Sequence, residues 1–144
     1  MIDIICSLYQ TRPFLFIGSI GLLFLFLFFL CSFFLYIYIN INLKNICKII
    51  VDDEMWYRTP LSPLTFHLLS ALPIVFRKEY LNIKYNIKFK KLYSKNYYFS
   101  LNESELKELI NKYPIFFYTQ YFILFSGVSF IFFIGIATIL SKFL

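Results

Sequence analysis

The chain has 144 residues, of which 60% are hydrophobic, 23% aromatic and 15% charged, and its net charge is +6. A soluble domain is typically about 45–50% apolar and about 25% charged, so the composition excludes a water-soluble domain without a lipid or protein cover. The frequent Phe, Ile, Tyr, Lys and Asn have A/T-rich codons, which indicates an A/T-biased genome. Cys6, Cys31 and Cys47 are scattered and predict neither a disulfide framework nor a metal site.

The first predicted element is a transmembrane helix at 13–39, which follows a short tail at 1–12. This run contains no charged residue and is longer than the roughly 20 apolar residues that cross a bilayer. Tyr36 and Tyr38 are typical of the aromatic belt at a membrane surface. Because the run exceeds the apolar core of a signal peptide and no small-residue cleavage site follows, we interpret it as a permanent anchor.

A second uncharged run predicts a transmembrane helix at 115–141, followed by a tail at 142–144. All Lys and Arg residues except Arg12 and Lys142 lie in the segment between the two spans, 40–114. The positive-inside rule therefore places this segment on the side of synthesis, which is the matrix side for a protein made inside mitochondria. Close approach of the helices is favoured by small residues, namely Gly18, Ser19 and Gly21 in one span and Ser126, Gly127 and Ser129 in the other.

The segment between the spans begins with an acidic run, Asp52, Asp53 and Glu54. Carboxylates can bind a hard cation, but three adjacent side chains cannot all point at one ion. We therefore favour a solvated turn, or an ion pair with the basic residues further along the chain. No metal-binding residue is predicted here.

An interfacial helix is predicted at about 63–72, with Ser62 as its N-cap, proline in its first turn and Pro73 after it. Apolar residues cover most of its circumference, which is typical of a helix in the bilayer surface or against another subunit. His67, the only histidine, could be a haem ligand or a general base. The sequence supplies no second ligand or orienting partner, so a packed or interfacial histidine is favoured.

The stretch RTPLSPLTF, residues 58–66, resembles the start of the haem-anchoring subunits of succinate dehydrogenase. The similarity ends at Phe66. The His-Arg pair, the Ser/Thr-Gly and the following span of that family have no counterpart after it. No residue is therefore assigned a role from this resemblance.

Apolar and polar residues alternate at about 81–90, which predicts a β-strand with one basic face. The letters YSKN could turn it back into YYFSL and form a short β-hairpin. The apolar face is expected to pack on a partner protein, and the basic face to contact anionic lipid such as cardiolipin or an acidic subunit. The basic residues could also serve only as an orientation signal. The residues expected to pack on a partner are Ile83, Tyr85, Ile87 and Phe89. The basic residues expected to contact lipid or a partner are Lys84, Lys88, Lys90 and Lys91.

A final helix is predicted at about 102–113, because Asn102 with Glu105, or Ser100 with Glu103, has capping-box spacing. Pro114 separates this helix from the second span. The predicted fold class is a mainly α membrane protein. Two transmembrane helices are joined by a small α+β loop region that contains a short β-hairpin.

The sequence contains no glycine-rich phosphate loop, metal-ligand spacing, catalytic triad or redox CxxC pair. We expect no enzyme activity, no catalytic, cofactor-binding or metal-binding residue, no cofactor and no nucleic-acid partner. Aromatic residues interleaved with cations can bind nucleic acid, but an A/T-biased genome also produces this pattern by default.

In composition and layout the whole chain resembles the small organelle-encoded membrane subunits of protist mitochondrial respiratory-chain and ATP synthase complexes. The resemblance implies a multi-pass protein of the mitochondrial inner membrane that stabilises such a complex and contacts other membrane subunits. The alternative from a different class is a free-standing membrane protein, such as a small translocation factor or lipid-surface adaptor.

Overall fold

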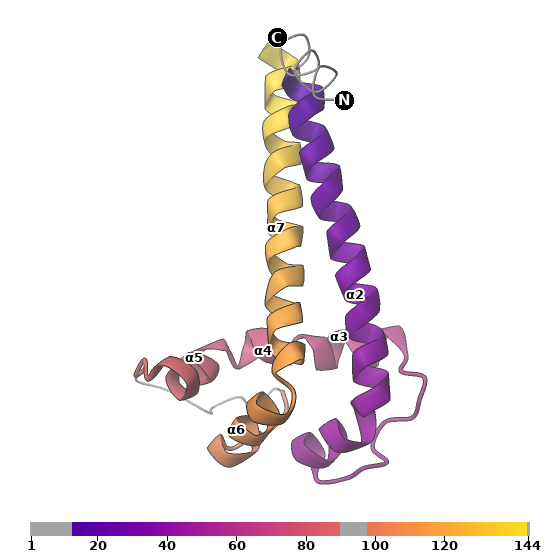
Figure 1. Ribbon diagram of the computed structural model, residues 1–144, viewed down its shortest axis with the longest axis vertical. Helices are drawn as coiled ribbons and strands as arrows, with labels where there is room; N and C mark the ends of the chain where they lie inside the picture. The colour runs from indigo at the N-terminus through magenta and orange to yellow at the C-terminus, as the bar shows by residue number, and fades with distance from the viewer. Residues whose placement is uncertain (1–12, 90–97, 144) are drawn as a thin grey trace. The chain divides into compact units, whose positions relative to one another are not determined.

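The computed structural model describes residues 13–89 and 98–143, and every regular element in these ranges is a helix. Two of the helices are long and apolar enough to cross a membrane. Only 6% and 11% of the residues in their most apolar stretches are buried by the rest of the chain, unlike the core helix of a soluble protein. The prediction of a mainly helical chain with two long apolar helices is thus confirmed, and these helices are consistent with a membrane-type protein. The helices are α2 (Pro13–Val51), α3 (Pro63–Ser70), α4 (Leu72–Val75), α5 (Arg77–Tyr85), α6 (Glu103–Lys112) and α7 (Pro114–Phe143), as Figure 1 shows.

Helix α2 continues past the predicted end of the first span at residue 39 and reaches Val51. The helix continues because an apolar stripe with helical spacing runs across residue 39, and the residues of this stripe after residue 39 are buried. The helix ends where Asp52 adopts a left-handed conformation with a φ of 56°. The buried stripe comprises Leu35, Ile39, Leu43, Ile46, Cys47 and Ile50.

The chain divides into two compact units. The two-helix unit contains residues 1–32 and 122–144, and the head unit contains residues 33–121. In the described part of the two-helix unit, the first part of α2 runs antiparallel beside the last part of α7 (Figure 1). The rings of Phe24 and Phe133 stack there with their centroids 5.6 Å apart.

Small residues allow the two helices of the two-helix unit to approach closely. A Cβ atom added at Gly21 would lie 3.1 Å from the side chain of Ile134, and one at Gly18 would lie 3.8 Å from Cβ of Ala137. A Cβ atom at Gly127 would lie 3.4 Å from the ring of Phe28. Glycines of both predicted small-residue groups therefore lie at the helix contact.

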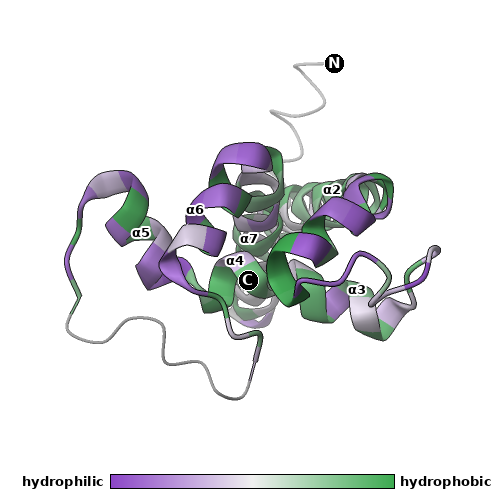
Figure 2. Cartoon of the chain, turned by 90° about the horizontal axis from the view of Figure 1, so that it is seen from below, coloured by the Kyte–Doolittle hydropathy of each residue, from purple (hydrophilic) through white to green (hydrophobic). Residues whose placement is uncertain are grey.

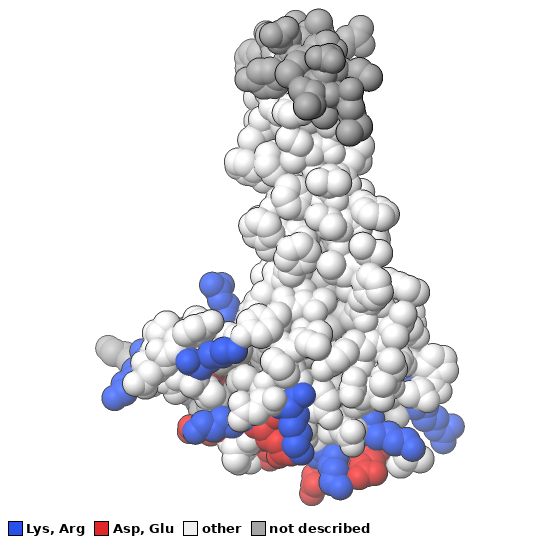
Figure 3. Space-filling view, in the orientation of Figure 1, with Lys and Arg blue, Asp and Glu red and all other residues white. Residues whose placement is uncertain are grey.

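The head unit has a core of large apolar side chains. Leu69, Leu72 and Phe76 come from the α3–α5 region and are each 0% exposed, as are Leu109 of α6 and Phe116 of α7. Hydrophilic and hydrophobic residues occur together on α5 and α6, as expected for helices with one buried side (Figure 2). Charged side chains gather on this unit (Figure 3), whereas Lys142 is the only charged residue in the described part of the two-helix unit.

Two short helices, α3 and α4, occupy the region predicted as one helix at 63–72. Ser62 is the N-cap of α3, and its hydroxyl oxygen accepts a hydrogen bond from the amide of Thr65 at 3.2 Å. Pro73 does not end the helical region but lies in the first turn of α4. A proline is tolerated there because the first amides of a helix have no partner within the helix.

The predicted β-hairpin is wrong, because the described residues contain no strand. Helix α5 occupies residues 77–85, and residues 86–89 and 98–101 have no regular structure. Phe76 and Tyr80 are both buried and lie four residues apart, which is helical spacing, just before the alternation of apolar and polar residues begins at Leu81. This spacing determines the local fold as a helix. Asn86 then ends the helix with a left-handed φ of 54°. Lys90 and the expected turn lie outside the described residues.

Helix α6 begins with a capping box formed by Asn102 and Glu105. The amide of Glu105 donates to Oδ1 of Asn102 at 2.9 Å, and the amide of Asn102 donates to Oε2 of Glu105 at 2.8 Å. Of the two spacings found in the sequence, the structure contains this one. Tyr113 follows α6, and α7 starts at Pro114.

Candidate functional site

The loop between α2 and α3 is fastened to α2 by two hydrogen bonds to Leu61. The hydroxyl of Tyr36 donates to the carbonyl oxygen of Leu61 at 3.1 Å, and the amide of Leu61 donates to Oδ1 of Asn40 at 2.9 Å. Nδ2 of Asn40 donates to the carbonyl oxygen of Tyr36 at 2.8 Å, which orients its amide group. The ring of Phe66 packs edge-on against Tyr36 and extends the contact to α3. These bonds, the Leu61 clamp, hold residues 59–61 against α2.

Two apolar grooves meet at Ile37 and Ile41 of α2. The first has a volume of about 520 Å³ and lies between α2 and residues 59–60. The second has a volume of about 270 Å³ and lies between α2 and the first turns of α7, near Ile115. Ile37 and Ile41 line both grooves and are 39% and 77% exposed. They form an apolar ridge close to residue 39, where the predicted first span ends.

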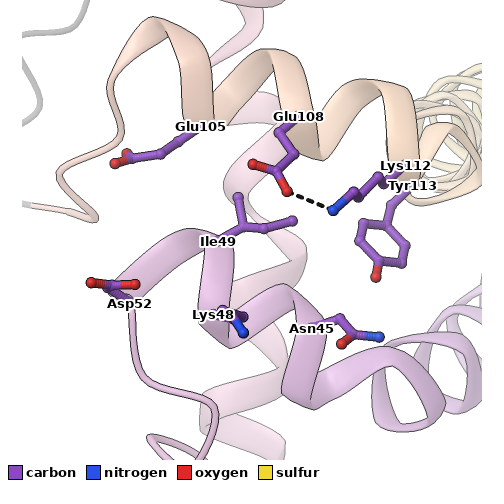
Figure 4. Close-up of a pocket in the computed structure, with 8 residues that line it drawn as sticks. All are labelled: Asn45, Lys48, Ile49, Asp52, Glu105, Glu108, Lys112 and Tyr113. Carbon is purple, nitrogen blue, oxygen red and sulfur yellow. Dashed lines mark hydrogen bonds and ion pairs between the residues drawn. The ribbon is translucent and has the colours of Figure 1, made fainter.

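A polar cavity of about 720 Å³ lies between the last turns of α2 and helix α6 (Figure 4). Nζ of Lys48 lies 2.9 Å from Oε1 of Glu54, and Nζ of Lys112 lies 2.6 Å from Oε1 of Glu108. These bonds lower the pKa of Glu54 and raise the pKa of Lys112. Both signs of charge line the cavity, so it does not favour an ionic ligand of one sign. The lining residues are Asn45, Lys48, Ile49, Asp52, Glu105, Glu108, Lys112 and Tyr113.

Large apolar side chains are exposed on the head unit outside the predicted spans. Met55 and Trp56, in the turn after α2, are 74% and 57% exposed, and Leu64 of α3 is 73% exposed. The backbone amide of Met55 donates to Oδ1 of Asp53 at 2.8 Å, so the turn that presents Met55 and Trp56 has a hydrogen bond of its own.

The predicted basic residues do not form one face in the described part of the chain. Lys84, at the end of α5, donates a hydrogen bond to the hydroxyl of Tyr118, and its Nζ lies 4.7 Å from the centre of the Tyr118 ring. This hydrogen bond raises the pKa of Lys84. Lys88 is exposed in the irregular segment after α5. Lys90 and Lys91 lie outside the described residues.

The predicted partner-packing residues are split between α5 and the segment that follows it. Ile83 is half-buried and Tyr85 is 57% exposed on α5, while Ile87 is 45% exposed and Phe89 half-buried after it. The Tyr85 ring lies 6.3 Å from that of the buried Tyr80. The four side chains do not share a strand face, and their contact with a partner stays a prediction.

The remaining polar candidates lie apart. His67 is exposed on α3, with its ring 5.6 Å from that of Phe66, and Cys47 is buried in α2. The acidic run forms a turn in which Glu54 pairs with Lys48, not with the basic segment. Among the residues that the structure describes, no group of three or more His, Cys, Asp or Glu side chains could hold a metal ion.

Comparisons with known proteins do not identify the chain: no family model, no curated protein and no solved structure matches it. The functional conclusions below therefore rest on its residues and their geometry.

Sequence reasoning missed Trp56 and Asn40. The signal for Trp56 was the single tryptophan beside a proline-containing loop, since tryptophan is enriched at protein interfaces. The signal for Asn40 was a side-chain amide directly after an uncharged run, where an unsatisfied polar group would be costly. Their partners, however, depend on how residues 52–61 fold back.

Proposed function

We propose that this chain is a non-catalytic structural or assembly subunit of a mitochondrial inner-membrane complex of the respiratory chain or ATP synthase. One observation carries the proposal, namely the exposure of Met55, Trp56 and Leu64 on the head unit. Burying a large apolar side chain contributes about 1.5–3 kcal/mol, so leaving three exposed in water forgoes a considerable gain. Contact with neighbouring membrane subunits would recover it.

The chemistry of this surface supports a protein partner. Trp and Met are enriched at the buried centres of protein interfaces, where Trp is often among the few residues that dominate affinity. Trp56 and Met55 are adjacent in a turn closed by Asp53, so they are presented together. Ile87 and Tyr85 are further exposed apolar residues on the same unit.

Composition and charge support the proposed location and orientation. The A/T-biased, aromatic-rich composition resembles that of organelle-encoded subunits of energy-transducing complexes. Lys and Arg residues gather on the head unit in Figure 3. By the positive-inside rule, we assign the segment between the predicted spans, 40–114, to the matrix side and both predicted spans to the inner membrane. Anionic lipid such as cardiolipin is expected at this surface.

A native gel of gently solubilised membranes, followed by mass spectrometry, tests membership of a complex. We expect the chain to migrate with one large respiratory or ATP synthase complex. Migration only as a free small protein would contradict the subunit proposal and support the free-standing alternative.

A matched pair of variants tests the exposed surface. Trp56→Ala should reduce the fraction of the chain found in the complex, whereas Lys107→Ala, a change of an exposed residue on α6, should not. Helix content measured by circular dichroism should be unchanged in both. Equal incorporation of the two variants would contradict a partner contact at Trp56.

The non-catalytic part of the proposal is tested at the only histidine. His67 is exposed, so His67→Ala should leave the turnover of a fully assembled host complex unchanged. Loss of turnover with assembly intact would instead assign His67 a chemical role.

A further inference from the structure

The apolar ridge at Ile37 and Ile41 is followed by exposed cations. Lys44 lies three residues after Ile41, which corresponds to about 4.5 Å along the helix axis. Seven residues, or close to two helical turns, separate Lys44 from Ile37, so these side chains share one face of α2. Arg58 directly precedes Thr59 in the segment that forms the other wall of the larger groove.

Both cations are available to a ligand. Lys44 and Arg58 are exposed, and neither forms a salt bridge with another described residue. The nearby carboxylate of Glu54 is already paired with Lys48. In a helix, side chains tilt toward the N-terminus, so the ammonium group of Lys44 can extend back toward the ridge.

We propose that the larger groove, with its ridge, binds one anionic phospholipid. An acyl chain lies along Ile37 and Ile41, and the phosphate is held between Lys44 and Arg58. Along α2, apolar side chains come first and cations follow, which is the order in which a lipid presents its tail and its headgroup on leaving the bilayer. The guanidinium group of Arg58 matches the planar, two-oxygen edge of a phosphate.

The Leu61 clamp makes this groove a pre-formed binding surface, because its second wall is held in place. It holds residues 59–61 against α2 through Tyr36 and Asn40 before any lipid arrives. A wall that is already in place avoids the entropic cost of ordering it on binding. A lipid also suits this place better than a second protein does, because Ile37 lies within the predicted membrane span and Ile41 directly after it.

The proposal requires a membrane location but not membership of a complex, so it is tested on the purified full-length chain. Native mass spectrometry of the chain in detergent would count bound lipids after addition of phosphatidylglycerol or of phosphatidylcholine with the same acyl chains. We expect one tightly bound phosphatidylglycerol and weaker binding of phosphatidylcholine. Equal binding of the two lipids would overturn the proposal.

The residues are tested by a double variant, Lys44→Gln with Arg58→Gln. Two basic residues near a membrane surface predict roughly 30-fold weaker binding of phosphatidylglycerol, which corresponds to about 2 kcal/mol. The control, Arg77→Gln with Lys107→Gln, removes the same two residue types from exposed positions on α5 and α6. It should bind as the unchanged chain does.

Three results would contradict this assignment. If the control variant lost as much phosphatidylglycerol binding, the lipid would be attracted by the net positive charge of the chain and not by this site. Unchanged phosphatidylglycerol binding in the Lys44 and Arg58 variant, with circular dichroism confirming its helix content, would place the lipid elsewhere. Copurification of a protein that is displaced by Ile41→Asp, with no retained lipid, would assign the groove to a protein partner instead.

Discussion

The two units of the chain are stabilised in different ways. In the two-helix unit, large side chains such as Phe26 and Phe29 are more than 60% exposed, and the helices meet where residues are small. In the head unit, large side chains such as Leu69, Phe76 and Leu109 are buried in a core, and charged side chains gather on the surface. A unit surrounded by lipid gains little from burying its apolar residues, so close helix packing stabilises it instead. The head unit instead has a hydrophobic core, which stabilises the residues that lie outside the predicted spans.

The strongest test of this contrast compares two leucines of α3. Leu69 is 0% exposed in the head core and Leu64 is 73% exposed. Leu69→Ala should destabilise the head unit by about 2–5 kcal/mol, because it removes buried methyl groups and leaves a cavity. Leu64→Ala should change its stability by less than about 0.5 kcal/mol.

Fluorescence of Trp56, the only tryptophan, during chemical denaturation in detergent would report unfolding of the head unit. Equal destabilisation by Leu69→Ala and Leu64→Ala would show that the head unit lacks a core of the kind described.

The second test compares two glycines in the two-helix unit. A Cβ atom at Gly21 would lie 3.1 Å from Ile134, whereas a Cβ atom at Gly135 meets nothing within 4 Å. Gly21→Leu should therefore destabilise the helix pair by about 1–3 kcal/mol through overpacking, and Gly135→Leu should not.

The readout for the glycine pair is a disulfide between Gly18→Cys and Ala137→Cys, with the native cysteines replaced by serine. The Cβ positions at these sites lie 3.8 Å apart, which suits a disulfide. The bond should form readily in the parent and in the Gly135→Leu variant, and more slowly in Gly21→Leu. Its failure in the parent would contradict the described helix contact.

The third test compares two asparagines of α2. Asn40 and Asn42 each donate to the carbonyl oxygen four residues earlier, but only Asn40 also accepts from the amide of Leu61. Asn40→Ala should cost about 1–2 kcal/mol, because a buried amide is left without its acceptor. Asn42→Ala should cost less.

Limited proteolysis of the loop at residues 52–61 would distinguish these variants. We expect faster cleavage in Asn40→Ala than in Asn42→Ala. The same cleavage rate in both would show that the clamp does not hold the loop.

The smallest expected effect is a loosening of the turn after α2 in acid. The bond to Lys48 lowers the pKa of Glu54, so this pair stabilises the folded turn above the unfolded pKa of glutamate, about 4.3. The contribution is lost as the pH falls through the lower, folded pKa. Both groups are exposed, so the effect should be slight and salt-sensitive.

Proteolysis at residues 52–56 at decreasing pH, compared with Glu54→Gln, would reveal the loss of this ion pair. The parent should approach the behaviour of the variant only in acid. A parent that matches the variant at neutral pH would show that the pair contributes nothing.

Apolar run length and capping residues were sufficient to predict the two long helices and the start of α6. They were sufficient because a charge-free run of that length and the Asn102–Glu105 spacing each have one strongly favoured structure. The hairpin was not predictable in this way. The alternation began at Leu81, inside α5 (Arg77–Tyr85), whose buried residues Glu79 and Tyr80 lie just before it.

The candidate surfaces depend on chain segments that meet only after folding. Basic residues were predicted to act together at Lys84 and Lys88, but Lys84 contacts Tyr118 on a helix far along the chain. The groove at Ile37 likewise needs residues 59–60, which the Leu61 clamp brings to α2. No local pattern records such contacts, because they depend on loop geometry and tertiary packing.

The Leu61 clamp has a consequence for how this protein can change during evolution. Tyr36 and Asn40 bind the main chain of Leu61, not its side chain. Mutations at position 61 that keep an apolar residue preserve both bonds, and so do most mutations at the exposed Thr59. The attachment can therefore persist while the loop sequence drifts, with selection acting mainly on two α2 residues whose codons are rich in A and T.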